Sequence, residues 1–294
     1  MSFGAPGTRG SPYINTVEQA NQVLDAFQKH AHVELDCSRQ YGEGTTEELL
    51  GEVGWQSRGL TMGTKLYPSA GNPLEKTAGY THAPEDVRRG MLDSLKALKS
   101  EKIDLFYLHG PDRKHPYEDT LRTLNELQLE GSFKRWGISN FMAWEVAHMC
   151  EICDRHGWVK PSVYQGHYHA LHRCVEDELV SLPEALRDRP RGDEIGNLHL
   201  KYGWNEGYWD ALDIILSAAE KLSMSIPEMA LRWLVHHSAL RVESGDAVIV
   251  GAGTVKNLEN NLVDLEKGQL SDEAVEALGK AWKACKATAP KYFH

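Results

Sequence analysis

Short apolar runs alternate with longer amphipathic runs along most of this chain of 294 residues. A short apolar run suits a buried strand, whereas apolar residues spaced three or four apart suit a helix that packs on one face. Alternation of the two is typical of βα units, because each helix returns the chain to the same edge of a parallel sheet. We therefore expect an α/β protein, and the length fits a single barrel domain over residues 1–294.

Several segments have the length and composition of one or the other element. The predicted strands are residues 32–36, 60–66, 103–109, 135–140, 162–167 and 247–251. The predicted helices are residues 83–100, 120–130, 144–156, 208–222 and 227–236. In the first of these helices, Val87, Met91 and Leu95 recur at a helical period and mark the side expected to be buried.

The composition limits the partners and the compartment. The net charge is −10, the pI is near 5.8, and no run of Lys or Arg occurs, which argues against binding to nucleic acid or to an anionic membrane. The first residues lack the pattern of a signal peptide, and no apolar run approaches the roughly 18 residues that span a bilayer. The five cysteines are scattered, as suits free thiols. We expect a cytoplasmic protein that binds small molecules or other proteins.

Two groups of metal-binding residue types have poor geometry for a metal site. Cys150 and Cys153 form a CxxC pair, but they fall in a predicted helix without a second pair, which favours two buried thiols. His236 and His237 are adjacent on a predicted helix and therefore point about 100° apart. No metal site is expected.

Polar residues stand at the C-terminal ends of the predicted strands. They are Asp36, Lys65, His109, the pair Ser139 and Asn140, and Gln165. In parallel α/β folds this edge of the sheet carries the chemistry, because the strand ends and the loops that follow them converge there. We expect these side chains to share one rim.

A phenol is expected at the same rim, because Tyr41 follows Asp36 by only five residues, in the loop after the predicted strand. With a reference pKa of about 10, a tyrosine is a poor proton donor at neutral pH unless a nearby cation stabilises its phenolate. Lys65 is the candidate cation, Asp36 its counter-charge, and His109 can hydrogen-bond a substrate oxygen. The set suits protonation of a carbonyl oxygen, and the hydride for the carbonyl carbon requires a nicotinamide or flavin cofactor.

A glycine turn near the C-terminus suits a phosphate. Residues 250–257, VGAGTVKN, run from a predicted strand through Gly251 and Gly253 into a helix with Thr254 as the expected N-cap. Backbone N–H groups at a helix start attract anions. The third glycine of a Rossmann fingerprint is missing, and a tight connection without a ligand is the alternative interpretation.

Together these residues resemble the aldo-keto reductase family, most closely its aflatoxin-aldehyde reductase branch and fungal relatives. The quartet Asp36, Tyr41, Lys65 and His109 accompanies the motifs DLFYLHGPD, GISNF, VYQGHYHA and GDAVIVGAG. The resemblance implies a (β/α)8 TIM barrel that uses NADPH without a Rossmann domain. It also suggests a homodimer, and a setting in detoxification or fungal secondary metabolism.

The resemblance implies a role for each site residue. Tyr41 is the general acid, which Lys65 and Asp36 tune, and His109 orients the carbonyl group. The residues implied to hold the nicotinamide carboxamide are Ser139, Asn140 and Gln165. Those implied to lie around the adenosine 2′-phosphate are Gly253, Thr254, Asn257 and Asn261, and Gly251 is a candidate through the glycine turn that suits a phosphate.

The chain departs from the family pattern in two places, so an incomplete barrel is expected. It begins at MSFG, after most of the family's first strand, and between Glu178 and Asp193 no strand is expected where relatives have the seventh. The sequence therefore predicts NADPH-dependent reduction of an aldehyde or ketone. The alternative is a catalytically impaired barrel that binds NADPH or a protein partner in a regulatory or structural role. A third interpretation is an error in the gene prediction, which sequencing of the transcript decides.

Overall fold

The computed structural model describes residues 2–8, 10, 12–72, 79–180, 190–192 and 205–293. The chain forms two compact units. The first holds residues 1–165 with residues 252–255 and 293–294, and the second holds residues 166–251 and 256–292. The single barrel domain inferred from the sequence stays a prediction.

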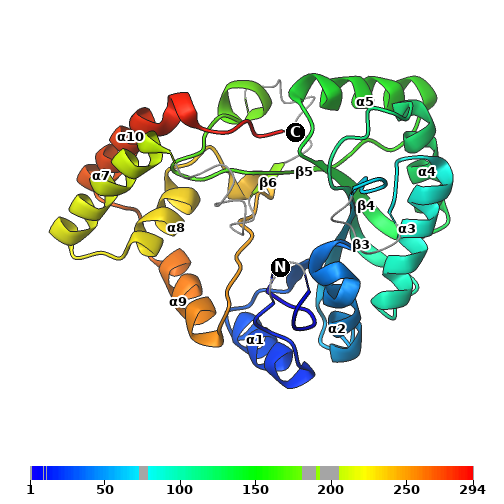
Figure 1. The fold of residues 1–294 in the computed structure, drawn as a ribbon, viewed down its shortest axis with the longest axis horizontal. Coiled ribbons are helices and arrows are strands. Elements are labelled where there is room, and N and C mark those ends of the chain that lie inside the picture. The colour runs from blue at the N-terminus through cyan, green and yellow to red at the C-terminus, as the bar shows by residue number, and fades with distance from the viewer. Residues whose placement is uncertain are drawn as a thin grey trace. The chain divides into compact units, whose positions relative to one another are not determined.

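A parallel sheet forms the centre of the first unit (Figure 1). Its strands are β1 (Glu34–Asp36), β2 (Thr61–Leu66), β3 (Ile103–Leu108), β4 (Phe133–Ser139) and β5 (Val163–Gly166). Each strand pairs with the next one along the chain, so the order in the sheet is the order in the sequence. Parallel neighbours bring their C-terminal ends to one edge, which is where the predicted site residues stand.

One helix precedes the first strand, and others connect the strands that follow. They are α1 (Val17–Lys29), the short 3-10 helix η1 (Tyr41–Gly44), α2 (Thr45–Val53), α3 (Pro84–Ala97), α4 (Tyr117–Leu129) and α5 (Ala143–His156). The apolar side of α3 is buried at Val87 and Met91, as its periodicity predicts, and α3 packs against β2 and α4. Figure 1 shows α3, α4 and α5 on the outer side of the sheet. The helices predicted at residues 83–100, 120–130 and 144–156 are confirmed, whereas α1 and α2 were not predicted.

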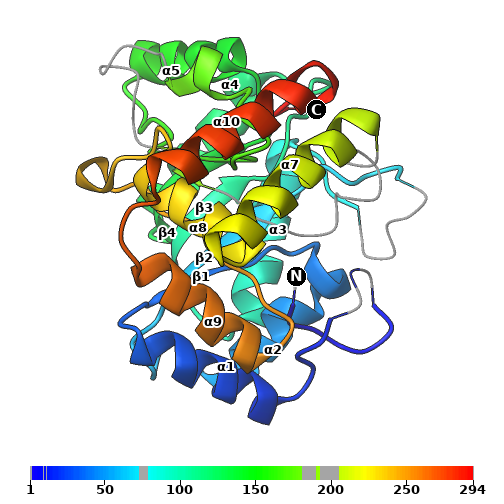
Figure 2. The same ribbon diagram turned by 90° about the vertical axis from the view of Figure 1, so that its left-hand side faces the viewer.

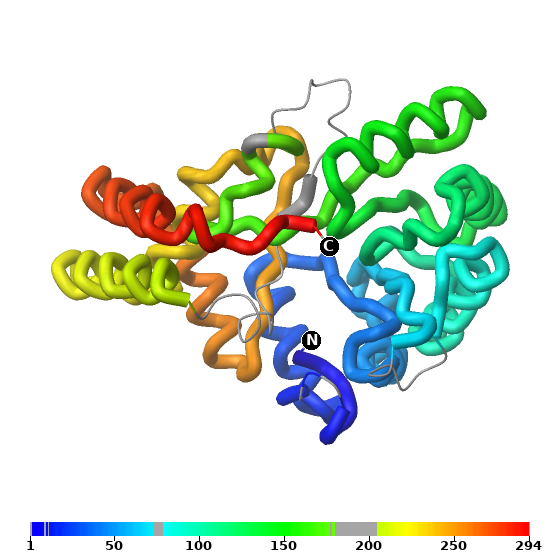
Figure 3. Tube along the Cα trace, turned by 45° about the horizontal axis from the view of Figure 1, so that its top comes forward, coloured from blue at the N-terminus to red at the C-terminus, as the bar shows by residue number. Residues whose placement is uncertain are grey.

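The described part of the second unit is mainly helical. It contains the π-helix η2 (Glu176–Val180), the strand β6 (Pro190–Gly192), α7 (Glu206–Leu222), α8 (Ile226–His236), η4 (Val242–Ser244), α9 (Val255–Glu266, whose first residue belongs to the first unit), α10 (Asp272–Cys285) and η5 (Lys286–Thr288). The helices α7 and α10 lie side by side (Figures 2 and 3). Small and aliphatic side chains such as Ala211 and Ala274 are buried on these helices. The helices predicted at residues 208–222 and 227–236 are confirmed.

Two strand predictions are wrong. Residues 247–251 form no strand, although they are rich in valine and isoleucine. A segment becomes a strand only when a neighbour completes its hydrogen-bonded ladder, and none of the described residues pairs with it. Conversely, Pro190–Gly192 is a short strand inside the stretch where none was expected. Backbone pairing needs no β-branched side chain, so composition gave no signal there. Residues 181–189 of the stretch between Glu178 and Asp193 lie outside the described residues.

The N-terminal segment is where the sequence predicts that most of the first strand is missing. Within the described residues it contributes one isolated bridge, between Phe3 and Ile14, and no named strand. A membrane span is also missing from the described part of the chain, where no helix is both long and apolar enough to form one.

A buried histidine next to α3 makes the stability of the first unit depend on pH. Neither ring nitrogen of His82 has a hydrogen-bond partner among the described residues. Burial lowers the pKa of His82 from 6.5 to about 4, against the opposing charge of Asp112. Between pH 6.5 and about 4, the imidazole of His82 is therefore protonated in the unfolded chain but neutral in the folded chain. The free energy of unfolding consequently falls as the pH drops from about 6.5 towards about 4.

Replacement of His82 by leucine removes this dependence. Between pH 7 and pH 5, we expect the wild-type protein to lose about 2 kcal/mol of unfolding free energy more than His82→Leu. Urea unfolding at the two pH values measures the difference. The exposed His148 provides the control, because His148→Leu should keep the wild-type dependence. Equal pH dependence in His82→Leu and the wild type would show that His82 is not the titrating group.

Candidate active site

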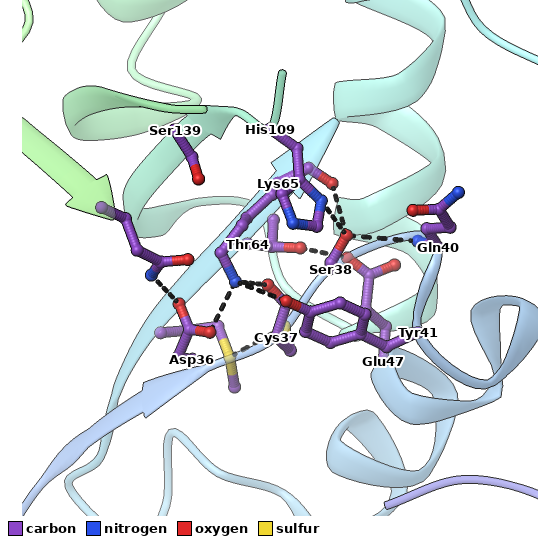
Figure 4. Close-up of polar contacts among 12 residues, drawn as sticks. Asp36, Cys37, Ser38, Gln40, Tyr41, Glu47, Thr64, Lys65, His109 and Ser139 are labelled. Atoms are coloured by element: carbon purple, nitrogen blue, oxygen red, sulfur yellow. Dashed lines mark hydrogen bonds and ion pairs between the residues drawn. The ribbon is translucent and has the colours of Figure 1, made fainter. Parts of the chain in front are cut away.

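The site is built around the fully buried side chain of Lys65 on β2. Its Nζ lies 2.5 Å from Asp36 Oδ2, 2.9 Å from the Cys37 carbonyl oxygen and 3.3 Å from the Tyr41 hydroxyl (Figure 4). Asp36 ends β1, which pairs directly with β2, so the sheet itself places the carboxylate beside the ammonium. The predicted meeting of Asp36, Tyr41 and Lys65 is confirmed geometrically.

Tyr41 is held by the tight turn of η1 and is only 5% exposed. Gly42 and Gly44 in this turn have positive φ angles of 55° and 97°, which glycine adopts without strain. Gly44 also leaves room for the guanidinium of Arg39, because a Cβ there would lie 1.7 Å from Arg39 Nη2. The turn is therefore shaped by backbone freedom and by one packed side chain.

A buried ion pair fixes this turn to its neighbours. Arg39 Nη1 donates to Glu47 Oε2 at 2.7 Å, and Thr64, the residue before Lys65, donates to Glu47 Oε1 at 2.5 Å. Burial raises the pKa of the fully buried Glu47, while Arg39 and Thr64 act in the opposite direction. The turn that carries Tyr41 is thereby tied to α2 and β2.

His109 directly follows β3, and its ring contacts the phenol. The Tyr41 and His109 ring centroids are 5.6 Å apart with an interplanar angle of 78°. His109 Nδ1 lies 3.1 Å from Ser38 Oγ (Figure 4). His109 thus completes the predicted quartet. Sequence reasoning missed Ser38, Arg39 and Glu47, because nothing in the local pattern distinguishes their side chains from ordinary loop and helix residues.

The residues predicted to hold a carboxamide also support the quartet. Ser139 and Gln165 are partners in the register of β4 and β5, and both are buried. Gln165 Nε2 donates to Asp36 Oδ1 at 2.9 Å, so the carboxylate is bound at both oxygens. Asn140 Nδ2 donates to the His109 carbonyl oxygen at 2.7 Å. These hydrogen bonds place Gln165 and Asn140 beside the quartet, Ser139 neighbours both of them, and the role of the three residues towards a cofactor stays a prediction.

The predicted phosphate residues gather around the start of α9. Gly251 and Gly253 lie in the irregular segment before the helix, Thr254 immediately precedes it, and Asn257 and Asn261 lie within it, four residues apart. Side chains four residues apart share one face of a helix. The predicted helix start is confirmed, and the phosphate role stays a prediction.

Three cysteine thiols of the first unit, those of Cys37, Cys150 and Cys153, are buried. Cys150 and Cys153 are free cysteines on α5, as the sequence indicates. Burial raises the pKa of Cys153 to about 12. Burial and the charge of Glu47 raise the pKa of Cys37, which adjoins the quartet. Both thiols therefore stay protonated and are poor nucleophiles at neutral pH.

Comparisons with known proteins agree with the geometry. The family model described as "Aldo/keto reductase family" matches residues 1–188 and 182–283. The aldo-keto reductase pigE of Monascus ruber is 40% identical over 324 residues, covering 99% of this chain and 95% of that protein. The human aflatoxin B1 aldehyde reductase member 2 is 35% identical over 329 residues, covering 98% of this chain and 90% of that protein.

A solved structure shows the same fold. It is an aldo/keto reductase from Klebsiella pneumoniae in complex with NADP and acetate, which aligns with a TM-score of 0.70 at 20% identity. The alignment covers 100% of this chain and 93% of that one.

The same comparisons agree with the expected shortening of the chain. The aligned length of 324 residues exceeds the 294 residues present here, so the Monascus protein contains stretches that this chain lacks. The two matches to the family model meet at residues 182–188, inside the stretch between Glu178 and Asp193. The geometry of the quartet, the aligned relatives and the family match lead to one conclusion: this chain belongs to the aldo/keto reductase family, a family of oxidoreductases.

Proposed function

We propose that the protein reduces an aldehyde or ketone to an alcohol with NADPH as the cofactor. The observation that carries the proposal is the buried ammonium of Lys65 at 3.3 Å from the hydroxyl of Tyr41. A phenol placed beside a buried cation can release its proton, because the cation stabilises the negative charge that forms on the oxygen.

The proton passes from Tyr41 to the carbonyl oxygen as that oxygen gains negative charge. Lys65 stabilises the phenolate that remains, and Asp36 neutralises the ammonium that would otherwise be buried alone. The hydroxyl is fixed before the substrate arrives, because the η1 turn is anchored through Arg39 and Glu47. Such preorganisation lowers the barrier since little reorganisation remains during the reaction.

His109 orients the carbonyl group in this proposal. Its ring stands edge-to-face against Tyr41, so an oxygen that meets the phenol is also within reach of the imidazole. Two donors converging on one oxygen fix the position of the carbonyl carbon. The combination of proton donor and orienting donor favours a small carbonyl compound as the substrate.

The residues present fit a nicotinamide cofactor. Ser139 and Gln165 offer a hydroxyl and an amide side by side at the ends of β4 and β5, groups that match both the donor and the acceptor of a carboxamide. Bound NADPH would supply the hydride for the carbonyl carbon. The Klebsiella structure is a complex with NADP, and the human relative is named an aldehyde reductase, which supports this choice of cofactor and substrate class. A homodimer and a cytoplasmic location stay predictions.

The experiment is to measure NADPH consumption with a panel of aldehydes and ketones. We expect the absorbance of NADPH to fall only when a carbonyl compound is present. Quenching of tryptophan fluorescence by NADPH reports binding independently of turnover. Binding without NADPH oxidation across the whole panel would refute the proposed reduction and favour the impaired barrel.

A charge placed on α9 tests the cofactor end of the site. We expect Asn261→Asp to weaken NADPH binding about tenfold, about 1.4 kcal/mol, because the new carboxylate repels the 2′-phosphate. Binding of NADH, which lacks this phosphate, should stay unchanged, and fluorescence titration measures both. Asn260→Asp is the matched control, since it adds the same charge at the neighbouring exposed position of α9. Equal loss of NADPH affinity in both variants would contradict a specific role for Asn261.

A further inference from the structure

A buried hydroxyl lies against the imidazole of His109. Ser38 is fully buried in the loop between Asp36 and Tyr41. Its Oγ is 3.1 Å from His109 Nδ1 and 3.3 Å from the carbonyl oxygen of Lys65 (Figure 4). The backbone N–H of Gln40 donates to the same Oγ at 3.3 Å. The hydroxyl therefore accepts from one backbone N–H, and it can donate its own proton either to His109 Nδ1 or to the Lys65 carbonyl oxygen.

The direction of this proton decides which ring nitrogen of His109 carries hydrogen. When Ser38 donates to Nδ1, a neutral His109 must hold its proton on Nε2. When Ser38 donates to the Lys65 carbonyl instead, its Oγ can accept a proton from Nδ1, as an imidazolium requires. A hydroxyl can serve both charge states because it is a donor and an acceptor at once.

We propose that Ser38 is a positioning residue that keeps Nε2 of His109 protonated, so that Nε2 donates to the substrate oxygen whether His109 is neutral or charged. The proposal rests on the proposed carbonyl reduction. In the neutral state Ser38 donates to Nδ1, and in the charged state it accepts from Nδ1 while donating to the Lys65 carbonyl oxygen. An imidazole with its proton on Nδ1 would instead present a lone pair to the carbonyl oxygen and repel it.

Among the described contacts of the His109 ring, the hydrogen bond at Nδ1 comes from Ser38. Two titratable side chains that face His109 in the described part of the chain are the phenols Tyr41 and Tyr67, which contact it edge-on. The charged groups beside them are Lys65, whose ammonium contacts the Tyr41 hydroxyl, and its partner Asp36. The hydrogen bond from Asn140 ends on the His109 backbone carbonyl. The Lys65 carbonyl oxygen already accepts the Arg39 N–H at 3.2 Å and lies farther from Ser38 Oγ than His109 Nδ1 does, which favours donation from Ser38 to Nδ1.

Nitrogen NMR of protein with isotopically labelled histidines tests the tautomer directly. The His109→Gln variant identifies the His109 signals by their disappearance. Above the titration of His109, we expect the proton on Nε2 in the wild type and a growing share on Nδ1 in Ser38→Ala. Ser38→Thr, which restores a hydroxyl, should restore the Nε2 proton. The control is Ser69→Ala, since Ser69 is also a buried serine that accepts a backbone N–H, from Tyr80.

Kinetics test the consequence. We expect Ser38→Ala to lower kcat for aldehyde reduction about ten- to hundredfold above the titration of His109, with unchanged affinity for NADPH. At lower pH, where His109 is charged, the loss of kcat in Ser38→Ala should be smaller, because an imidazolium carries a proton on Nε2 whether or not Ser38 is present. A proton on Nδ1 in the wild type, or an unchanged tautomer or pH profile in Ser38→Ala, would overturn the proposal. If the wild type reduces no carbonyl compound, the proposed function fails, and the NMR spectra alone decide the tautomer.

Discussion

Replacement of Tyr41 by phenylalanine is expected to lower kcat for aldehyde reduction about a thousandfold and to leave the affinity for NADPH nearly unchanged. The aromatic ring stays in its buried place against His109, so the shape of the site is preserved. Only the hydroxyl beside Lys65 is lost, and with it the proton for the carbonyl oxygen.

Single-turnover and steady-state kinetics with 4-nitrobenzaldehyde, together with NADPH titration, measure the two quantities. Tyr164→Phe is the matched control, because Tyr164 is another buried phenol, whose hydroxyl donates to the Phe141 carbonyl oxygen. The control should keep kcat within about threefold of the wild type. If Tyr41→Phe reduces 4-nitrobenzaldehyde as fast as the wild type, Tyr41 is not the proton donor.

Replacement of Lys65 by methionine is expected to damage both activity and stability. Methionine has a similar length and no charge, so the phenolate of Tyr41 loses its stabilising cation and kcat falls about a thousandfold. Asp36 keeps the hydrogen bond from Gln165 but loses the ion pair, which costs about 3 kcal/mol of unfolding free energy. Urea unfolding and steady-state kinetics measure the two losses.

A double variant separates these two effects. In Asp36→Asn with Lys65→Met both charges are gone, so most of the lost unfolding free energy should return. Activity should not return, because the phenol still lacks a cation. Recovery of activity together with stability would mean that Lys65 acts only through folding and takes no part in the proton transfer.

The quartet was predictable because each of its members has a local signal. Asp36, Lys65 and His109 stand where an apolar run ends, and parallel strands bring such positions to one edge. Tyr41 follows in the loop that leaves the first of these strands. Strands β1 to β5 were predictable for the same reason, since a short apolar run is recognised without knowledge of distant partners.

The contacts that support the quartet had no such signal. The hydrogen bond from Gln165 to Asp36 joins residues 129 positions apart, and the one between Ser38 and His109 joins residues 71 apart. Sequence reasoning assigned Gln165 to a cofactor and passed over Ser38, because a polar residue at a strand end has many possible partners. The prediction for residues 247–251 was wrong in the opposite way, because their composition is typical of a strand but they form none.

The sequence by itself determined five of the helices, the strands β1 to β5 and the residues at their ends, because these depend on neighbours a few positions away, and motifs spread along the chain determined the family. Only the tertiary structure decided which side chains meet, since strand register and the turn at Tyr41 set distances between remote parts of the chain. Hydrogen bonds act over about 3 Å, so a polar residue acquires its role only when the fold has placed its partner.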